Sequence, residues 1–227
     1  MSTPSRPSRR EEIGAMRRSY GEKGLVEQEL PATPFPLFDQ WLAEAAANDF
    51  IIEANAMVLS TGSDHQPSSR SVLLKDFSER GFTFFTNYTS QKAREIAENS
   101  FVSLVFPWYA MERQVLVRGR AEKVDSGESD RYFATRPYGS QIGAWASNQS
   151  ELLQSREELE NRYQEFAEKY PEGSPVPRPP HWGGFLVTPH LVEFWQGRYS
   201  RLHDRIRYVV DDSEGAKIHW SRMRLNP

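Results

Sequence analysis

The fold is decided by residues 56–86, which read AMVLSTGSDHQPSSRSVLLKDFSERGFTFFT. Three short runs rich in Val, Leu, Phe and Thr lie in this stretch, at residues 56–61, 69–74 and 82–86. Between them stand the polar segments 62–64 and 78–81, whose residue types favour tight turns. The pattern predicts antiparallel strands joined by hairpin-like turns.

The same pattern returns along the rest of the chain. Further strands are predicted at residues 101–106, 114–124, 184–188, 191–195, 205–210 and 217–220. Helices are predicted at residues 37–47, 90–98, 127–135 and 151–169, with Ser90 as the N-cap of the second, and the Pro-rich residues 171–180 are expected to form a loop. Many strands with few helical crossovers indicate a mainly β fold with peripheral helices, an α+β protein whose antiparallel sheet closes toward a barrel.

Length and hydrophobic content set the domain organisation. A chain of 227 residues, 38% of them hydrophobic, is expected to form a single soluble domain over residues 16–227. Residues 1–15 are rich in Ser, Pro and Arg without apolar periodicity, so we expect them to be disordered. We expect neither a membrane span nor a secretory signal, because no run of eighteen apolar residues occurs. The expected location is the cytoplasm.

Composition also limits the chemistry. The chain has no cysteine, which excludes disulfides and thiolate metal sites, and five scattered histidines make a metal cluster unexpected. Redox chemistry would therefore need a bound organic cofactor. A net charge of -3 argues against a nucleic-acid-binding protein, whose domain is usually strongly basic. Local clusters of Arg and Lys then suggest small anionic ligands.

One segment near the C-terminus, EFWQGRYSRLHDR at residues 193–205, combines aromatic residues, three arginines and a histidine. If it is a strand, Arg201, His203 and Arg205 fall on one face by period-two alternation. Such a row of cations around an imidazole suits a phosphorylated, ring-shaped ligand. A solvated edge strand decorated with charges fits the spacing equally well.

This segment resembles the C-terminal signature of the pyridoxamine 5'-phosphate oxidase family, and the similarity extends from about Met16 to the end of the chain. Matching blocks follow in order: residues 70–75, 85–87, 90–92, 106–108, 112–114, 136–137, 140–145, 182–184 and 222–227. The resemblance implies an FMN-binding split β-barrel that forms a homodimer, with two flavin sites between the subunits and a C-terminal dimerisation and substrate segment at about residues 183–227. Exposed aromatics, expected at Trp108 and Tyr109, would also favour a dimer.

The resemblance implies that the enzyme oxidises pyridoxine 5'-phosphate or pyridoxamine 5'-phosphate with O2 to pyridoxal 5'-phosphate and hydrogen peroxide, releasing ammonia from the amine. No metal, membrane or nucleic acid takes part. The FMN-binding residues would be Arg70, Ser71, Val72, Leu73, Leu74, Lys75, Phe85, Thr86, Gln91, Lys92, Gln114, Gln149, Ser150, Trp195 and Arg205. Arg70 and Lys92 suit the flavin phosphate, and Gln114 and Gln149 suit the polar edge of the isoalloxazine ring. The family commonly has Tyr where this chain has Phe85, and Arg where it has Gln91. Backbone contacts at Phe85 would survive that change, but the cation lost at Gln91 is expected to weaken FMN binding.

The substrate site implied by the resemblance holds the 5'-phosphate with Lys75, Tyr132, Arg136 and Ser140. Tyr132 and Arg136 are four residues apart, on the predicted helix or at its end, and therefore share a face. The catalytic residues at the pyridine ring would be Arg201 and His203, with His203 assisting proton removal or orienting the C4' substituent. Arg17, Arg18 and Tyr20 would belong to an N-terminal segment that closes over the substrate.

Three other readings stay open. Split barrels also serve as flavin reductases or deazaflavin-dependent reductases, which need not combine Arg136, Arg201 and His203. A non-catalytic protein that binds FMN or pyridoxal phosphate could keep every phosphate ligand. A generic interaction domain is the weakest reading, because it leaves the clustered Arg, His and Trp unexplained.

Overall fold

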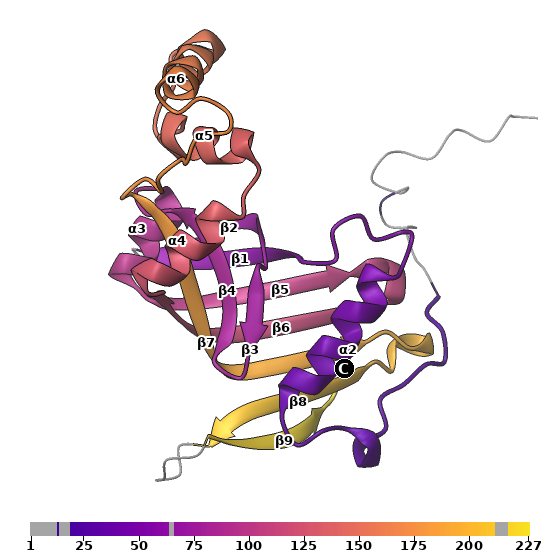
Figure 1. The fold of residues 1–227 in the computed structure, drawn as a ribbon. Coiled ribbons are helices and arrows are strands. Elements are labelled where there is room, and N and C mark those ends of the chain that lie inside the picture. The colour runs from indigo at the N-terminus through magenta and orange to yellow at the C-terminus, as the bar shows by residue number, and fades with distance from the viewer. Residues whose placement is uncertain (1–12, 14–18, 64–65, 212–217) are drawn as a thin grey trace, which may run out of the picture.

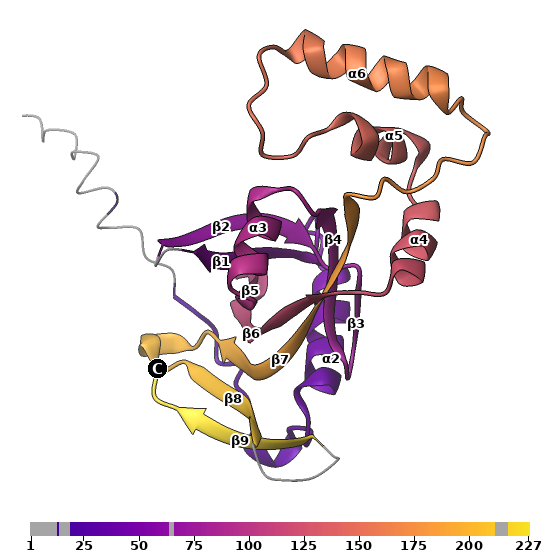
Figure 2. The same cartoon turned by 90° about the vertical axis from the view of Figure 1, so that its left-hand side faces the viewer.

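A computed structural model describes residues 13, 19–63, 66–211 and 218–227 (Figures 1 and 2). The strands are β1 (Ala56–Ser63), β2 (Gln66–Leu73), β3 (Asp76–Ser78), β4 (Gly81–Asn87), β5 (Phe101–Trp108), β6 (Arg113–Lys123), β7 (Trp182–Gln196), β8 (Asp204–Asp211) and β9 (His219–Leu225). The helices are η1 (Glu27–Glu29), α2 (Pro34–Ala46), α3 (Gln91–Glu98), η2 (Tyr109–Met111), α4 (Ser126–Ala134), α5 (Tyr138–Ala146), α6 (Arg156–Lys169) and η3 (Tyr199–Arg201).

The described strands form one nine-stranded antiparallel sheet, with the order β2-β1-β5-β6-β7-β4-β3. Strand β7 is the branch point: its first half pairs with β4 and its second half with β8, which also pairs with β9. Because β4 and β8 use different halves of β7, the sheet divides there and remains an open barrel. The predicted mainly β fold, a split barrel with peripheral helices, is confirmed.

Strand β7 replaces two strands that the sequence predicted separately, at residues 184–188 and 191–195. Strand β6 pairs along both halves of β7, with a register shift between Arg118 and Gly119. Pro189 lies opposite Gly119 at this irregularity, where a missing N–H is tolerated within a strand. A Cβ on Gly119 would lie 2.3 Å from the Thr188 carbonyl oxygen, so only glycine fits. The bulge therefore joins the two predicted strands into one.

Helix α2 closes one side of the barrel core (Figure 1). Phe38 packs edge-on against Phe82 and Phe106, each with ring centroids 5.0 Å apart, and Trp41 packs against Phe194 at 5.2 Å. Trp108 was expected to be exposed, and this is wrong: it is 2% exposed, and its Nε1 donates to the Ala54 carbonyl oxygen at 2.9 Å. Its neighbour Tyr109 is 75% exposed, as expected.

Helices α4, α5 and α6 follow β6, and α5 and α6 lie beyond the end of the barrel (Figures 1 and 2). Helix α4 matches its prediction within one residue at each end. Helix α6 begins later than predicted, at Arg156, because Ser155 caps it by accepting from the Glu158 amide at 3.1 Å. Helix α5 was not predicted, since its two glycines lower helix propensity. Among the described residues, no helix is long and apolar enough to cross a membrane.

Candidate active site

A cavity of about 910 Å³ lies between the barrel strands and helices α4 and α5. Strand β2, strand β4, the start of α3, the end of α4 and helix α5 all contribute to its walls. Fourteen residues that the sequence predicted for the flavin or substrate lie in this lining: Arg70, Ser71, Val72, Leu73, Lys75, Phe85, Thr86, Gln91, Lys92, Tyr132, Arg136, Ser140, Gln149 and Ser150. Leu74 does not, because its side chain packs in the hydrophobic core.

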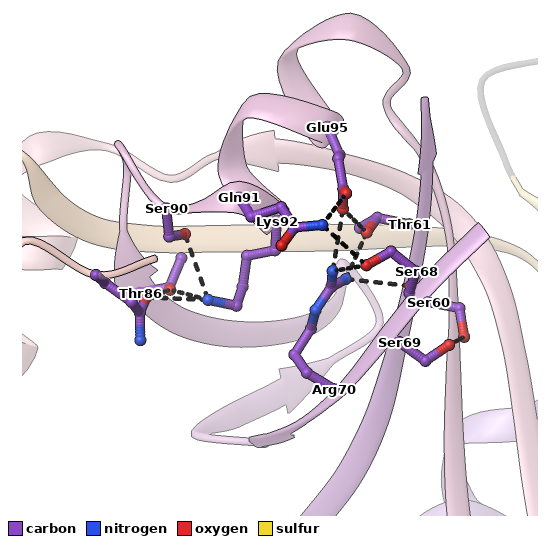
Figure 3. Close-up of polar contacts among 11 residues, drawn as sticks. Ser60, Thr61, Ser68, Ser69, Arg70, Thr86, Ser90, Gln91, Lys92 and Glu95 are labelled. Carbon is purple, nitrogen blue, oxygen red and sulfur yellow. Dashed lines mark hydrogen bonds and ion pairs between the residues drawn. The ribbon is translucent and has the colours of Figure 1, made fainter. Parts of the chain in front are cut away.

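Lys92, in the first turn of α3, brings a buried ammonium to one wall of the cavity (Figure 3). Its Nζ donates to Thr86 Oγ1 at 3.2 Å, Ser90 Oγ at 3.3 Å and Gln149 Oε1 at 2.9 Å, and all three acceptors are neutral. Burial, together with the Arg70 charge, lowers the pKa of the Lys92 ammonium to about 8. An anion in the cavity would offset this cost.

Two predicted residues at this wall have definite partners in the structure. Ser90 occupies the N-cap of α3, but its side chain makes no capping hydrogen bond and accepts from Lys92 instead. Gln149 was expected at the polar edge of a flavin ring. That contact stays a prediction, and in the structure the Gln149 Oε1 accepts from Lys92 and, at 3.0 Å, from Thr86 Oγ1. Gln149 therefore belongs to the surroundings of the Lys92 ammonium in this structure.

Arg70 is held by a buried carboxylate beside the same wall (Figure 3). Its Nη2 lies 3.0 Å from Glu95 Oε2, and its Nη1 donates to the Ser68 carbonyl oxygen at 3.2 Å and to Thr61. Burial raises the pKa of the Glu95 carboxyl, but hydrogen bonds from Thr61, Gln91 and Arg70 outweigh it and hold that pKa below its usual value. The Arg70 charge is therefore compensated within the protein, whereas Lys92 is surrounded by neutral acceptors.

A third cation, Arg136, lies just beyond the end of α4 and also lines the cavity. Its Nη1 is buried and has no hydrogen-bond partner among the described residues. Its guanidinium carbon lies 4.6 Å from the ring centroid of Trp182, the first residue of β7. Burial lowers the pKa of the Arg136 guanidinium. Arg136 therefore brings to the cavity lining a charged group whose buried donor has no acceptor among the described residues.

Trp182 was not predicted as a site residue, although it stands in one of the family-like blocks. It lines the cavity and stacks on Phe85, with ring centroids 5.5 Å apart and planes 13° apart. Phe85 in turn stacks on Tyr132 at 3.9 Å. No spacing pattern in the sequence marks this stack, because the three rings come from β4, α4 and β7. Other lining residues that sequence reasoning missed are Ser68, Ser69, Asn87, Thr135, Pro137, Gly143, Ala144 and Ser147.

The remaining predicted residues form a second group near the far end of β7. Trp195 and His203 lie with ring centroids 4.7 Å apart, and Tyr20 packs edge-on against them at 5.8 and 5.4 Å. Gln114 and Arg205 are the cross-strand neighbours of Trp195 on either side, so these three side chains share one face of the sheet. Arg17 and Arg18 lie outside the described residues.

The predicted strand face of Arg201, His203 and Arg205 is wrong. Arg201 ends η3, and positive φ angles at Ser200 (56°) and Arg201 (62°) break the alternation of an extended chain. Strand β8 begins only at Asp204. His203 is instead oriented by the Arg198 amide, which donates to its Nδ1 at 3.0 Å, and Arg201 is exposed.

One protomer keeps the two groups of residues apart. Trp182 in the cavity and Trp195 in the second group lie at opposite ends of β7, and thirteen steps of a fully extended strand span at most roughly 40 Å. The sequence predicted both groups as parts of one site. Within a single chain the structure places them in two.

Comparison with known proteins identifies the family. A family model described as pyridoxamine 5'-phosphate oxidase matches residues 43–170, and one described as the pyridoxine 5'-phosphate oxidase C-terminal dimerisation region matches residues 182–227. The chain belongs to the pyridoxamine 5'-phosphate oxidase family. It is 52% identical over 217 residues to the pyridoxine/pyridoxamine 5'-phosphate oxidase of Streptomyces avermitilis, covering 94% of this chain and 95% of that protein. The corresponding protein of Rubrobacter xylanophilus is 51% identical, with 96% and 98% covered.

Solved structures of relatives agree with this family. PhzG from Burkholderia lata, solved in complex with tetrahydrophenazine-1-carboxylic acid, superposes with a TM-score of 0.82 and 31% identity, covering 91% of this chain and all of that one. A pyridoxamine 5'-phosphate oxidase-related, FMN-binding protein from Nostoc punctiforme gives a TM-score of 0.67 at 16% identity, covering 87% and 100%. The second likeness supports the oxidase-family fold alone.

Proposed function

We propose that this protein is an FMN-dependent oxidase that converts pyridoxine 5'-phosphate or pyridoxamine 5'-phosphate to pyridoxal 5'-phosphate, with O2 as electron acceptor. The observation that carries the proposal is two separate cations in the lining of one cavity: Lys92, which is buried, and Arg136, which is partly buried and has a buried, unpaired Nη1. Two phosphorylated ligands, one cofactor and one substrate, would give each cation an anionic partner. The oxidases named among the relatives act on phosphorylated substrates of this kind.

The lining fits FMN at the Lys92 wall. A phosphate beside Lys92 would replace neutral acceptors by a charged one, while Thr86 and Ser71 offer hydroxyl groups and Arg70 keeps its paired charge nearby. When bound, FMN accepts the two electrons from the substrate and passes them to O2, which becomes hydrogen peroxide. The protein's part is to orient the ring and to exclude water from it.

The substrate phosphate fits the Arg136 wall. Lys75, Tyr132 and Ser140 line the cavity together with Arg136, so two cations and two hydroxyl groups are available to one phosphate. Anchoring the phosphate orients C4' toward the flavin and makes the oxidation effectively intramolecular. Binding energy from this remote group can then lower the barrier at the carbon that reacts.

The second group of residues completes the site from another subunit in this proposal. Two copies related by a two-fold axis could each bring the Trp195 and His203 end of β7 to the partner's cavity. The match of residues 182–227 to a dimerisation region supports this arrangement. His203 of the partner subunit would then hold or move a proton at the C4' substituent, and the partner's Arg201 would face the pyridine ring.

Turnover tests the proposed function directly. Purified protein loaded with FMN should show the two visible absorption bands of a bound flavin and should release hydrogen peroxide when pyridoxine 5'-phosphate is added. Peroxide without formation of pyridoxal 5'-phosphate would contradict the proposal. Bound flavin with no turnover would support the binding-protein reading, and oxidation of a nicotinamide cofactor in place of the substrate would support a reductase.

We expect Lys92→Met to bind FMN about 10- to 100-fold more weakly, because it removes a charge-assisted hydrogen bond worth roughly 1.5–3 kcal/mol. Fluorescence titration of the apoprotein with FMN measures this. Lys169→Met is the matched control, since that lysine is exposed on α6 outside the cavity, and it should bind FMN normally. Excess FMN should restore most activity to the Lys92 variant. A variant that stays inactive when saturated with FMN would show a different role.

The pH dependence gives this prediction a second readout. With the pKa of Lys92 at about 8 in the free protein, the ammonium is charged below pH 8 and neutral above it. A bound phosphate favours the charged form, so FMN affinity should fall as pH rises above 8, by at most about tenfold per pH unit. Lys92→Met should lack this decline. An unchanged decline in the variant would assign it to another group.

Arg201→Ala and His203→Ala should both keep FMN bound while lowering kcat/KM for pyridoxine 5'-phosphate about ten- to a hundredfold. The variants should differ in kind. Replacing His203 should mainly lower kcat and alter the pH profile of kcat, whereas replacing Arg201 should also raise KM. Steady-state kinetics against pH on flavin-saturated protein measures both. Near wild-type kinetics in both variants would mean that the catalytic groups lie elsewhere.

A further inference from the structure

We propose that Trp182 is a positioning residue for the substrate phosphate, because its indole holds the Arg136 guanidinium at the cavity wall without occupying any of its N–H donors. This inference rests on the proposed function, in which Arg136 binds the 5'-phosphate. It goes beyond that function by assigning the selection of phosphorylated substrates to a residue that does not itself carry a charge.

The guanidinium of Arg136 is held by aromatic rings. Its Cζ lies 4.6 Å from the Trp182 ring centroid and 5.7 Å from that of Phe133. Its side chain makes no hydrogen bond or ion pair with any residue in the described part of the chain, and its buried Nη1 is orphaned. A guanidinium lying over an aromatic face keeps its N–H groups free, because they point outward in the guanidinium plane.

The indole that supports Arg136 is itself fixed. Trp182 is 7% exposed, stacks on Phe85 at 5.5 Å and packs edge-on against Phe133 at 5.2 Å. Its backbone pairs with Asn87 in the sheet, and its carbonyl oxygen accepts from Arg178 Nη1 at 2.5 Å. A ring anchored on two sides leaves Arg136 few alternative orientations.

Arg70 illustrates the alternative way to orient a guanidinium, in which a carboxylate and other acceptors bind its N–H groups. Its terminal nitrogens are engaged by Glu95, Ser68 and Thr61, so a ligand would compete with acceptors that are already in place. Arg136 is oriented without any carboxylate, and a phosphate therefore meets no competitor. An aromatic support gives orientation while leaving both the charge and the donors of Arg136 available to the ligand.

The test compares phosphorylated with unphosphorylated pyridoxine as substrates of Trp182→Phe and Trp182→Leu. We expect Trp182→Leu to lower kcat/KM for pyridoxine 5'-phosphate about tenfold, through a higher KM and a lower kcat, and to leave the slow oxidation of pyridoxine unchanged. The ratio of the two kcat/KM values then falls about tenfold. Trp182→Phe should lie between this variant and wild type. Trp220→Leu is the matched control, because Trp220 packs on Phe35 outside the cavity, and its ratio should equal that of wild type.

Binding at equilibrium separates this inference from the proposed function. Calorimetry on FMN-loaded protein should show that Trp182→Leu loses affinity for pyridoxal 5'-phosphate but not for pyridoxal. Equal losses for both ligands, or an unchanged ratio of kcat/KM values, would overturn the positioning role. If Trp182→Leu does not fold, Trp182→Phe decides by the same ratio. A wild-type protein that binds pyridoxal 5'-phosphate but does not oxidise pyridoxine 5'-phosphate would refute the proposed function and leave the binding comparison valid.

Discussion

Pyridoxine without its 5'-phosphate should be oxidised about a thousandfold less efficiently than pyridoxine 5'-phosphate, as judged by kcat/KM. Lys75, Arg136 and Ser140 line the cavity and would have nothing to bind. Charge-assisted hydrogen bonds to a phosphate contribute roughly 1.5–3 kcal/mol each, so losing two or three removes about 4 kcal/mol or more. Part of the loss should appear in kcat, because binding of a remote group also serves the reaction at C4'.

Arg136→Ala provides the matched variant for this comparison. It should lower kcat/KM for pyridoxine 5'-phosphate about a hundredfold while leaving that for pyridoxine nearly unchanged, so that the preference for the phosphorylated form shrinks. FMN binding should be unaffected, since Lys92 lies at the other cation site. Comparable turnover of both substrates by the wild-type protein would contradict the assignment of this wall to the phosphate.

Mixed dimers of Arg136→Ala and His203→Ala should recover activity that neither variant has alone. If each active site combines the cavity of one subunit with the Trp195 and His203 group of the other, a mixed dimer contains one intact site and one doubly altered site. Heterodimers carrying two different tags, purified in tandem, should therefore show about half of the wild-type activity. Each parent homodimer should show only a few per cent.

The reciprocal pairing is the control for that experiment. A chain carrying both substitutions, paired with a wild-type chain, leaves every shared site with one altered half, and its heterodimer should be nearly inactive. If each chain built a complete site of its own, the results would be reversed. The heterodimer of the doubly substituted chain with a wild-type chain would then keep half of the activity, and the heterodimer of the two single variants would recover none. Light scattering on the wild-type protein must also report a dimer, and a monomer that binds FMN stoichiometrically would refute the shared site.

Local pattern was enough to predict most of the sheet. The run at residues 82–86 lies within β4, and the run at residues 101–106 within β5, because β-branched and aromatic residues between turn signals fit a pleated, buried surface. Helix α5 could not be predicted this way. Its stability comes from packing against α6, which Trp145 contacts through Phe166 at 5.4 Å, and not from the propensity of a segment with two glycines.

The membership of the cavity was predictable only through the family resemblance, and its internal pairing was not predictable at all. Arg70 and Glu95 are 25 residues apart, and nothing in their spacing shows that a strand and a helix bring them within 3.0 Å. Arg136 and Trp182, which are in contact in the structure, are 46 residues apart in the sequence. Strand alternation failed at Arg201 because two left-handed residues interrupt the chain there. Tertiary contacts and local backbone conformation decide these features.

Strand β7 sets the spacing between the two groups of predicted site residues in each subunit. In the proposed dimer, Trp182 at one end of β7 contributes to one active site, and Trp195 at the other end contributes to the second active site. The length of this one strand therefore fixes how far apart the two contributions lie. Deleting one residue of β7 between Leu191 and Trp195, after the irregularity opposite Gly119, would turn the Trp195 side chain to the opposite face of the sheet while leaving Trp182 in place. Both active sites therefore constrain the length of β7: substitutions in it can be accepted, but an insertion or a deletion would misalign one half of each site.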